Sequence, residues 1–204
     1  MTTAQGSQLV VEQLIRVTTK EARYLERTTD RLRAQNIDLS WVESLEASDE
    51  RSEMLDAFVS RYGRLQDTLG DKLLPAMLRT ALEKTGAQLD NLLRAEKLGW
   101  IESTQDWIEL RELRNRLVHE YMESTDDLLD ALQQALQGVD VLTKTQSRMT
   151  AYAQKSRVTQ HKWHSIRPTL LSCVTTIKPP SPSVIARRRS QRGNPENWQF
   201  RIRV

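Results

Sequence analysis

The sequence predicts an all-α protein, an antiparallel bundle of four to five helices, and two observations support this class. Apolar residues recur at intervals of three or four along most of residues 8–155, the spacing that places them on one face of a helix. No stretch before residue 156 alternates apolar and polar residues as a half-buried strand would. With 38% hydrophobic residues in a chain of 204, we expect one domain with a proper core rather than two.

Residues 8–35 are predicted to form the first helix. It is predicted to be amphipathic, with charged residues on one face. The apolar residues of the other face are Val10, Leu14, Val17, Tyr24, Leu25 and Leu32. Asn36 and Asp38 then break the pattern. The following residues, 39–45, fit either a short helix or a packed loop.

The second helix is expected to begin at Ser48 or Asp49, because both side chains can cap a helix N-terminus. Gly70 and Pro75 interrupt its apolar pattern. Since a proline inside a helix loses one backbone hydrogen bond and clashes with the preceding turn, we expect a kink or a restart there. The helical pattern then continues to a predicted stop at Gly86.

A short third helix is predicted over residues 89–98, and Gly99 is placed to end it. Ser103, followed three residues later by Asp106, resembles a capping box at the start of the next helix. That fourth helix carries the chemically unusual part of the chain, residues 114–121.

The last predicted helix begins at Ser124 or Thr125 and fades near Lys155. Beyond that point the composition changes to proline, arginine and serine without sustained periodicity, which predicts a disordered basic tail. The chain is therefore expected to consist of a helical domain, residues 1–155, and a tail, residues 156–204.

Charge is divided unequally between these two parts. Residues 156–204 hold ten Lys or Arg and one acid, Glu196, a formal charge of +9. The whole chain carries +3, so residues 1–155 carry 3 − 9, or −6. The basic pI of the whole chain therefore gives no indication that the helical domain binds nucleic acid.

We expect a cytoplasmic protein with no membrane partner. No apolar run approaches the roughly 18 residues that a membrane-spanning helix needs, and residues 1–10 lack the pattern of a signal peptide. The lone Cys173 excludes an internal disulfide. No residue pattern indicates a metal site or another cofactor, and we expect none.

Residues 114–121 place rare, chemically capable side chains in an otherwise ordinary helix. The guanidinium of Arg114 can hold a phosphate through two hydrogen bonds, and His119 exchanges protons near neutral pH. The pair suits metal-free cleavage of a phosphodiester, with His119 moving a proton and Arg114 stabilising the developing negative charge. Asn115 is expected to support them by orienting the histidine or the phosphate.

Structural roles would also account for these residues. On a helical wheel Arg114 falls in an apolar stripe made of Trp107, Leu110, Leu117, Val118 and Tyr121. An arginine there is commonly paired with a buried acid, and Tyr121 fits a core or interface tyrosine. His119 lies five residues, roughly 140° of rotation, from Arg114. A catalytic pair therefore needs either a bend or an end of the helix near His119, or a two-fold partner with its own copy of both residues.

The series Arg114-Asn115-x-x-x-His119-x-Tyr121 resembles the Arg-polar-x-x-x-His-x-Tyr signature of the HEPN superfamily, most closely of its HepT-like toxin branch. The resemblance covers roughly residues 50–155. It implies a HEPN-like bundle and a metal-independent endoribonuclease toxin that cuts RNA as a homodimer, in a cleft between two facing motifs. It also implies a nucleotidyltransferase antitoxin that attaches AMP to Tyr121, which would add negative charge and bulk beside Arg114.

Two other interpretations stay open at this point. One is a non-catalytic HEPN module that binds a nucleotidyltransferase, and the other is a helical dimerisation scaffold in which Arg114 is only a member of an ion pair. Residues 60–67 resemble the companion helix of the HEPN family, but the sequence assigns no chemistry to Arg61, Arg64 or Asp67.

Overall fold

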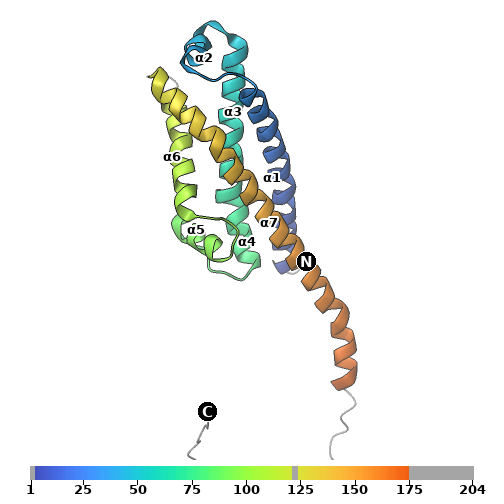
Figure 1. Cartoon of the computed structure of the whole chain (residues 1–204). Coiled ribbons are helices and arrows are strands. Elements are labelled where there is room, and N and C mark those ends of the chain that lie inside the picture. The colour runs from blue at the N-terminus through green and yellow to red at the C-terminus, as the bar shows by residue number, and fades with distance from the viewer. Residues whose placement is uncertain (1–2, 121–123, 175–204) are drawn as a thin grey trace, which may run out of the picture. The chain divides into compact units, whose positions relative to one another are not determined.

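The computed structural model describes the backbone of residues 3–120 and 124–174 and the side chains of residues 6–118 and 124–156. Every regular element within these ranges is helical, which confirms the predicted all-α class. The main helices are α1 (Thr3–Arg33), α3 (Asp49–Asp67), α6 (Thr104–Glu120) and α7 (Thr125–Val174) (Figure 1). Contacts divide the chain into two units, Met1–Thr159 and Gln160–Val204, and the helical bundle is the first of them.

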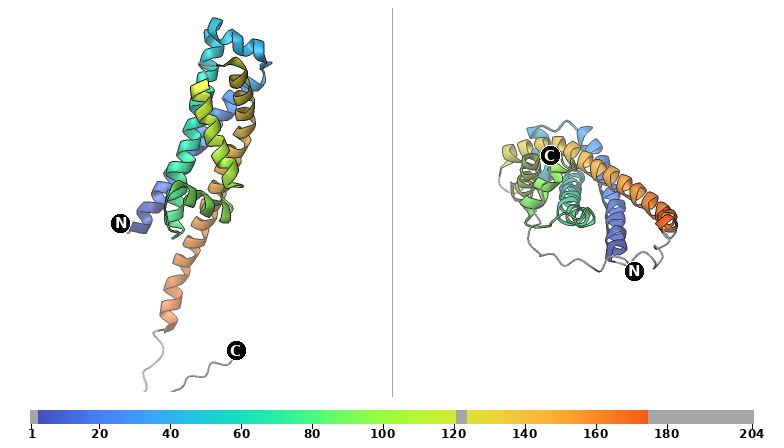
Figure 2. Two further views of the ribbon diagram at one scale, coloured as in Figure 1. Left: turned by 90° about the vertical axis from the view of Figure 1, so that its left-hand side faces the viewer. Right: turned by 90° about the horizontal axis from the view of Figure 1, so that it is seen from below.

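Helix α3 lies between α1 and α6, both in Figure 1 and in the view from below in Figure 2, and α7 crosses one face of this layer. Two glycines show how α3 and α6 meet: a Cβ at Gly63 would lie 3.0 Å from Arg114, and one at Gly70 would lie 3.0 Å from Trp107. Later residues on one side face earlier residues on the other, so α6 runs antiparallel to α3 and its continuation, as predicted.

Helix α7 packs across the layer through the first part of its length. The Gln146 amide donates a hydrogen bond to the Thr19 hydroxyl of α1 at 2.9 Å. Gly138 meets α6 and α3 so closely that a Cβ there would lie 2.4 Å from Leu110 and 2.8 Å from the Tyr62 hydroxyl. The missing side chain at position 138 therefore allows three helices to meet at one point.

The buried face of α1 differs in part from the predicted one. Leu25 and Leu32 are buried as expected, but Val10, Val17 and Tyr24 are exposed by 48%, 38% and 45%. Their place in the core is taken by Val11 and Ala22 and by three threonines, Thr18, Thr28 and Thr29. Each threonine hydroxyl donates to a backbone carbonyl one turn earlier, at 2.9 to 3.1 Å, so its polar group is satisfied inside the core. The predicted face was built from apolar residues alone and therefore missed the buried threonines.

Serine caps confirm the predicted starts of three helices. Each serine accepts a hydrogen bond from the backbone N–H three residues later, at 3.1 to 3.4 Å. These serines are Ser48 before α3, Ser103 before α6 and Ser124 before α7.

The ambiguous segment after α1 is helical. It forms α2 (Leu39–Glu43) and the 3-10 turn η1 (Ser44–Ala47). Asp38, expected only to break the first helix, caps α2 by accepting a hydrogen bond from the Trp41 N–H at 2.9 Å. This cap helps to hold the buried Trp41 side chain against the core.

The second predicted helix is interrupted where glycine and proline indicated. Helix α3 continues into the π-helical segment η2 (Thr68–Leu73) and then α4 (Leu74–Thr80), with Pro75 in its first turn. Because a proline has no N–H to donate, the wider π turns accommodate the missing hydrogen bond. The predicted stop at Gly86 is wrong, since α4 ends at Thr80.

Leu82 explains this early stop. Its φ is +59°, in the left-handed region that favours glycine, and its side chain is 95% exposed. The N–H of Glu83 then closes the helix on the Leu78 carbonyl at 2.9 Å. By contrast, α5 (Gln88–Lys97) is followed by the predicted glycine, Gly99, with a φ of +72°.

Helix α7 continues to Val174, so its predicted end near Lys155 is wrong. Residues 156–167 contain neither glycine nor proline, and the local sequence there does not stop a helix. The disorder predicted for the tail falls, from residue 175 onward, outside the described residues. In the ranges that the structure describes, no helix combines the length and the apolar character that crossing a membrane requires.

Replacing Gly138 with alanine should lower the free energy of unfolding by about 1–2 kcal/mol. Overpacking against Leu110 and Tyr62 costs about 1–3 kcal/mol, and the better helix propensity of alanine returns at most about 1 kcal/mol. Urea denaturation measures the difference. Gly6→Ala is the matched control, because a Cβ there meets nothing within 4 Å and should leave stability unchanged or slightly raised. Equal effects of the two variants would contradict the close packing at position 138.

Replacing Leu82 with glycine should raise the free energy of unfolding by about 1 kcal/mol, because the left-handed backbone no longer carries a Cβ. The exposed side chain buries nothing that the substitution would lose. Thermal unfolding followed by circular dichroism measures the gain. Leu82→Ala keeps the Cβ and serves as the control, and an equal gain in that variant would show that backbone strain is not the cause.

Candidate functional site

A surface cavity of about 530 Å³ opens between α3 and α6, and Arg114 lies on its wall. We call it the α3–α6 cavity. Its charged lining residues are Arg64, Asp67, Lys72 and Arg114. Three cations and one carboxylate give it a formal charge of +2, on a domain whose predicted total is −6. The cavity is therefore a local positive site on an acidic domain.

Arg114 is held by its own chain and remains accessible. Its Nη2 donates to Asp67 Oδ2 at 2.7 Å, and its Nη1 donates to Asn115 Oδ1 at 3.1 Å. The side chains of Arg114 and Asp67 are 30% and 41% exposed. The acid partner that a structural role requires is thus present, although it is not buried. Asn115 thus contacts the Arg114 guanidinium, whereas its predicted role, orienting the histidine or the phosphate, stays a prediction.

The approach of α6 to α3 explains where the guanidinium lies. Arg114 passes over Gly63, where a Cβ would come within 3.0 Å of its Nε. One further pair joins the same two faces, because Arg111 lies 3.5 Å from Asp71. Two basic residues of α6 therefore face two acidic residues of α3 and η2.

The predicted apolar stripe of α6 is confirmed in three of its positions and wrong in one. Trp107, Leu110 and Leu117 are buried, and so is Leu113, which the wheel analysis left out. Val118 is 54% exposed and lines the α3–α6 cavity instead of the core. The reason is that α6 packs against α7 as well as α3, which turns its buried face toward Leu113 and away from Val118.

The remaining two residues of the motif are only partly described. His119 belongs to α6, which stays helical to Glu120, but its side chain lies outside the described residues, and so does all of Tyr121. Because the helix is continuous from Arg114 to Glu120, the rotation of roughly 140° between positions 114 and 119 is preserved. The described part of α6 stops at Glu120, one residue after His119, so a bend or an end of the helix near His119 and a two-fold partner both stay predictions.

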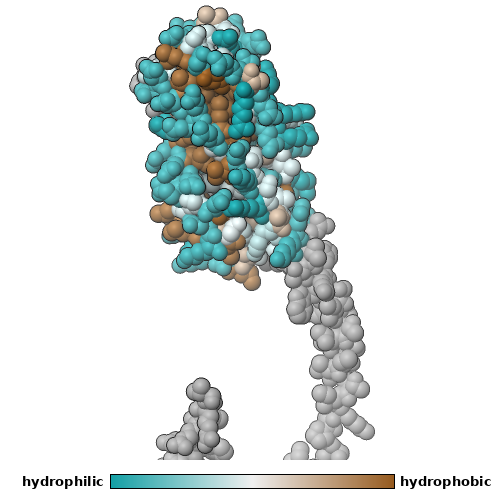
Figure 3. Space-filling model, viewed as in Figure 1, coloured by the Kyte–Doolittle hydropathy of each residue, from teal (hydrophilic) through white to brown (hydrophobic). Residues whose placement is uncertain are grey.

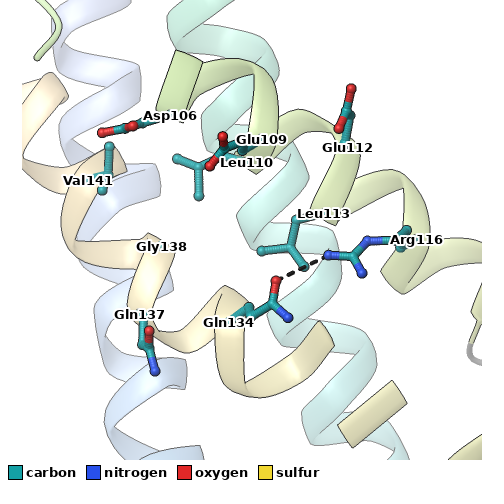
Figure 4. Close-up of a pocket in the computed structure, with 10 residues that line it drawn as sticks. All are labelled: Asp106, Glu109, Leu110, Glu112, Leu113, Arg116, Gln134, Gln137, Gly138 and Val141. Atoms are coloured by element: carbon teal, nitrogen blue, oxygen red, sulfur yellow. Dashed lines mark hydrogen bonds between the residues drawn. The ribbon is translucent and has the colours of Figure 1, made fainter. Parts of the chain in front are cut away.

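A second cavity, of about 500 Å³, lies between α6 and α7 (Figure 4). The charged residues of this α6–α7 cavity are Asp106, Glu109, Glu112 and Arg116, a formal charge of −2. Arg116 donates to the Gln134 side chain across it at 3.2 Å. Apolar surface also shows on this face of the molecule, among largely hydrophilic residues (Figure 3). Opposite charges therefore distinguish the two cavities, and an anionic ligand favours the α3–α6 cavity.

Glu21 of α1 faces the two outer cations of the α3–α6 cavity. Burial raises the pKa of its carboxyl group, and a hydrogen bond with Thr68, followed by the nearby charges of Arg64 and Lys72, opposes that rise. Glu21 therefore offsets part of their positive charge, and neither cation lies within 4 Å of an acid among the side chains that the structure describes.

Sequence reasoning assigned no role to Arg64, Lys72 or Asp67. One signal was available: Asp67 and Asp71 are four residues apart, and Arg111 and Arg114 are three apart, so both ion pairs can form between two antiparallel helices. The spacing predicts these ion pairs only if the two helices are known to be neighbours, and hydrophobic periodicity does not show which helices are neighbours.

A double-mutant cycle with Asp67→Asn and Arg114→Gln should give a coupling energy of about 0.5–1 kcal/mol, measured by urea denaturation. The estimate is small because both side chains are partly exposed and water screens their attraction. The same cycle at Asp71 and Arg111 is the control, because that pair is longer, at 3.5 Å, and more exposed. A coupling energy near zero between Asp67 and Arg114 would contradict the assignment of Asp67 as the principal partner of Arg114.

In comparisons with known proteins, the chain matches no protein-family model, no curated protein and no solved structure. The likeness to the HEPN signature therefore rests on the residues of the motif themselves, from Arg114 to Tyr121.

Proposed function

We propose that this chain is a metal-independent endoribonuclease of the HEPN type, the toxin of a bacterial toxin-antitoxin pair, which binds RNA at the α3–α6 cavity. The observation that carries the proposal is the position of Arg114, an accessible guanidinium on the wall of a cavity with a formal charge of +2. RNA presents a negatively charged backbone, and the acidic surface elsewhere on the domain would repel it. The positive charge at this cavity would allow RNA to bind to a domain whose net charge is negative.

The proposed chemistry is attack of a ribose 2′-hydroxyl on the adjacent phosphorus. The new bond to O2′ gives a 2′,3′-cyclic phosphate, the bond from phosphorus to the 5′-oxygen of the next nucleotide breaks, and the proton lost by the 2′-hydroxyl is balanced by one gained by that 5′-oxygen. His119 transfers a proton during the reaction, and Arg114 stabilises the negative oxygens of the phosphorane. Asn115 and Asp67 hold the guanidinium from two sides, which fixes its direction before the substrate arrives. Neither a metal nor another cofactor has a role in this scheme.

The proposed enzyme is a homodimer, in which the motifs of two chains face each other across a shared cleft. On a continuous helix positions 114 and 119 point in different directions, and a two-fold partner brings a second copy of each to the same place. A nucleotidyltransferase antitoxin would inactivate the dimer by attaching AMP to Tyr121, since the added phosphate would compete for the cations of the cavity.

A second candidate function is a helical dimerisation or binding module without catalysis. The ion pair between Arg114 and Asp67 favours it, because an arginine that is already paired has a sufficient structural role. The two candidates differ in what removal of Arg114 changes: catalysis in the first and only stability or partner binding in the second.

The test is cleavage of a labelled single-stranded RNA by the purified full-length protein, with a chelator present. Wild type should cut the RNA, and Arg114→Gln and His119→Ala should each lower the rate about 100-fold or more, as loss of a transition-state charge partner or of a proton-transfer group does. A strand in which 2′-O-methyl groups block the attacking hydroxyls should stay intact.

Arg116→Gln is the matched control, because it removes the same charge from the same helix on the side of the other cavity. Melting temperatures of all variants separate loss of chemistry from loss of folding. Cleavage that persists in both motif variants, or that is absent from the wild type, would leave the binding module as the better account.

A further inference from the structure

Arg64 and Lys72 line the α3–α6 cavity from a different helical segment than Arg114, which lies on α6. Position 64 lies on α3 and position 72 on the π-helical segment, eight residues later, so both belong to one face of this continuous helical stretch. π-helical turns in α-helices are frequent at functional sites.

Arg64 and Lys72 form no close ion pair among the described side chains, unlike the cations of α6. Arg114 is paired with Asp67 and Arg111 with Asp71, whereas Arg64 and Lys72 have no acid within 4 Å among the described side chains. Glu21 influences both from a greater distance. Both are exposed residues that also line a cavity, so an anion can reach them without displacing a protein group.

A ligand with more than one phosphate can use all the cations of the cavity. Arg114 lines it from α6, and Arg64 and Lys72 line it from α3 and η2, in one cavity of about 530 Å³. A nucleic-acid strand carries its phosphates at regular intervals and satisfies such a pair of sites with adjacent phosphates. Ser60, an exposed residue of the same lining, adds a hydroxyl donor.

We propose that Arg64 and Lys72 bind the backbone phosphate next to the one that Arg114 holds, which makes the α3–α6 cavity an extended site for single-stranded RNA. The assignment rests on the proposed function for its ligand, and it adds two residues that bind without reacting. Their loss should weaken binding and raise KM, while kcat for bound substrate stays close to that of wild type.

The experiment measures binding apart from cleavage. A fluorescent single-stranded oligonucleotide with 2′-O-methyl groups lacks the attacking hydroxyls, and its anisotropy with the full-length protein reports affinity alone. Arg64→Gln and Lys72→Gln should each weaken binding roughly five- to tenfold at low salt. Each should also reduce the slope of log K against log salt by about 0.7, the value for one lost contact to a single-strand phosphate.

Arg116→Gln and Lys97→Gln are the matched controls, since they remove the same charges from exposed positions outside the α3–α6 cavity. The basic segment after residue 156 is present in every variant, so its contribution to binding cancels in the comparison. Cavity variants that bind no more weakly than these controls would overturn the proposal. So would pyrophosphate that displaces the oligonucleotide at a concentration comparable to that of the oligonucleotide itself, because the cavity would then be a site for small anions.

The outcome separates this site from the proposed reaction. Weakened binding in both cavity variants, with no RNA cleavage by any form of the protein, would support the phosphate site and remove the ribonuclease. Cleavage with an unchanged KM in Arg64→Gln and Lys72→Gln would support the ribonuclease and remove the phosphate site.

Discussion

The close approach of α6 to α3 and η2 determines where the charged groups of this protein lie. Two glycines permit it, because Gly63 leaves room for the Arg114 side chain and Gly70 leaves room for the indole of Trp107. The glycines are seven residues apart, as are Arg114 and Trp107, so the contacts repeat after two turns on both helices. A Cβ at Gly70 would press on the rigid indole of Trp107, and a Cβ at Gly63 would displace the Arg114 side chain, which forms the ion pair with Asp67.

Helix α7 fixes the same arrangement from the other face. Gly138 brings its backbone against Leu110 and the Tyr62 hydroxyl, which turns the apolar stripe of α6 toward α7. Arg114 and Val118 are left at the edge of that stripe, where they line a cavity instead of the core. An arginine at this edge remains accessible to a ligand, while Asp67 partly compensates its positive charge. The partial compensation lowers the cost of placing a charge beside the core.

The two faces of α6 consequently carry cavities of opposite formal charge. The α3–α6 cavity holds +2 and the α6–α7 cavity −2, although both are of similar volume and share one helix as a wall. The net charge and the pI of the whole chain do not reveal that the two cavities carry opposite charges. Attraction between a protein and its ligand depends on charges within about a Debye length of the site, about 8 Å at physiological salt. Local charge, rather than the acidity of the domain, therefore carries the argument for an anionic ligand.

Sequence patterns alone predict the all-α class, the starts of α3, α6 and α7 at their serine caps, the interruption near Gly70 and Pro75, and the anomaly of Arg114 in an apolar stripe. These features depend on residues within a few turns of one another, which periodicity and capping rules describe. The packing of the helices is needed to see that Asp67, 47 residues away, is the partner of Arg114, that Val118 is exposed, and that Arg64 and Lys72 share the cavity. Periodicity gives the angle of a side chain around its own helix, whereas the neighbour at that angle depends on how helices distant in sequence pack together.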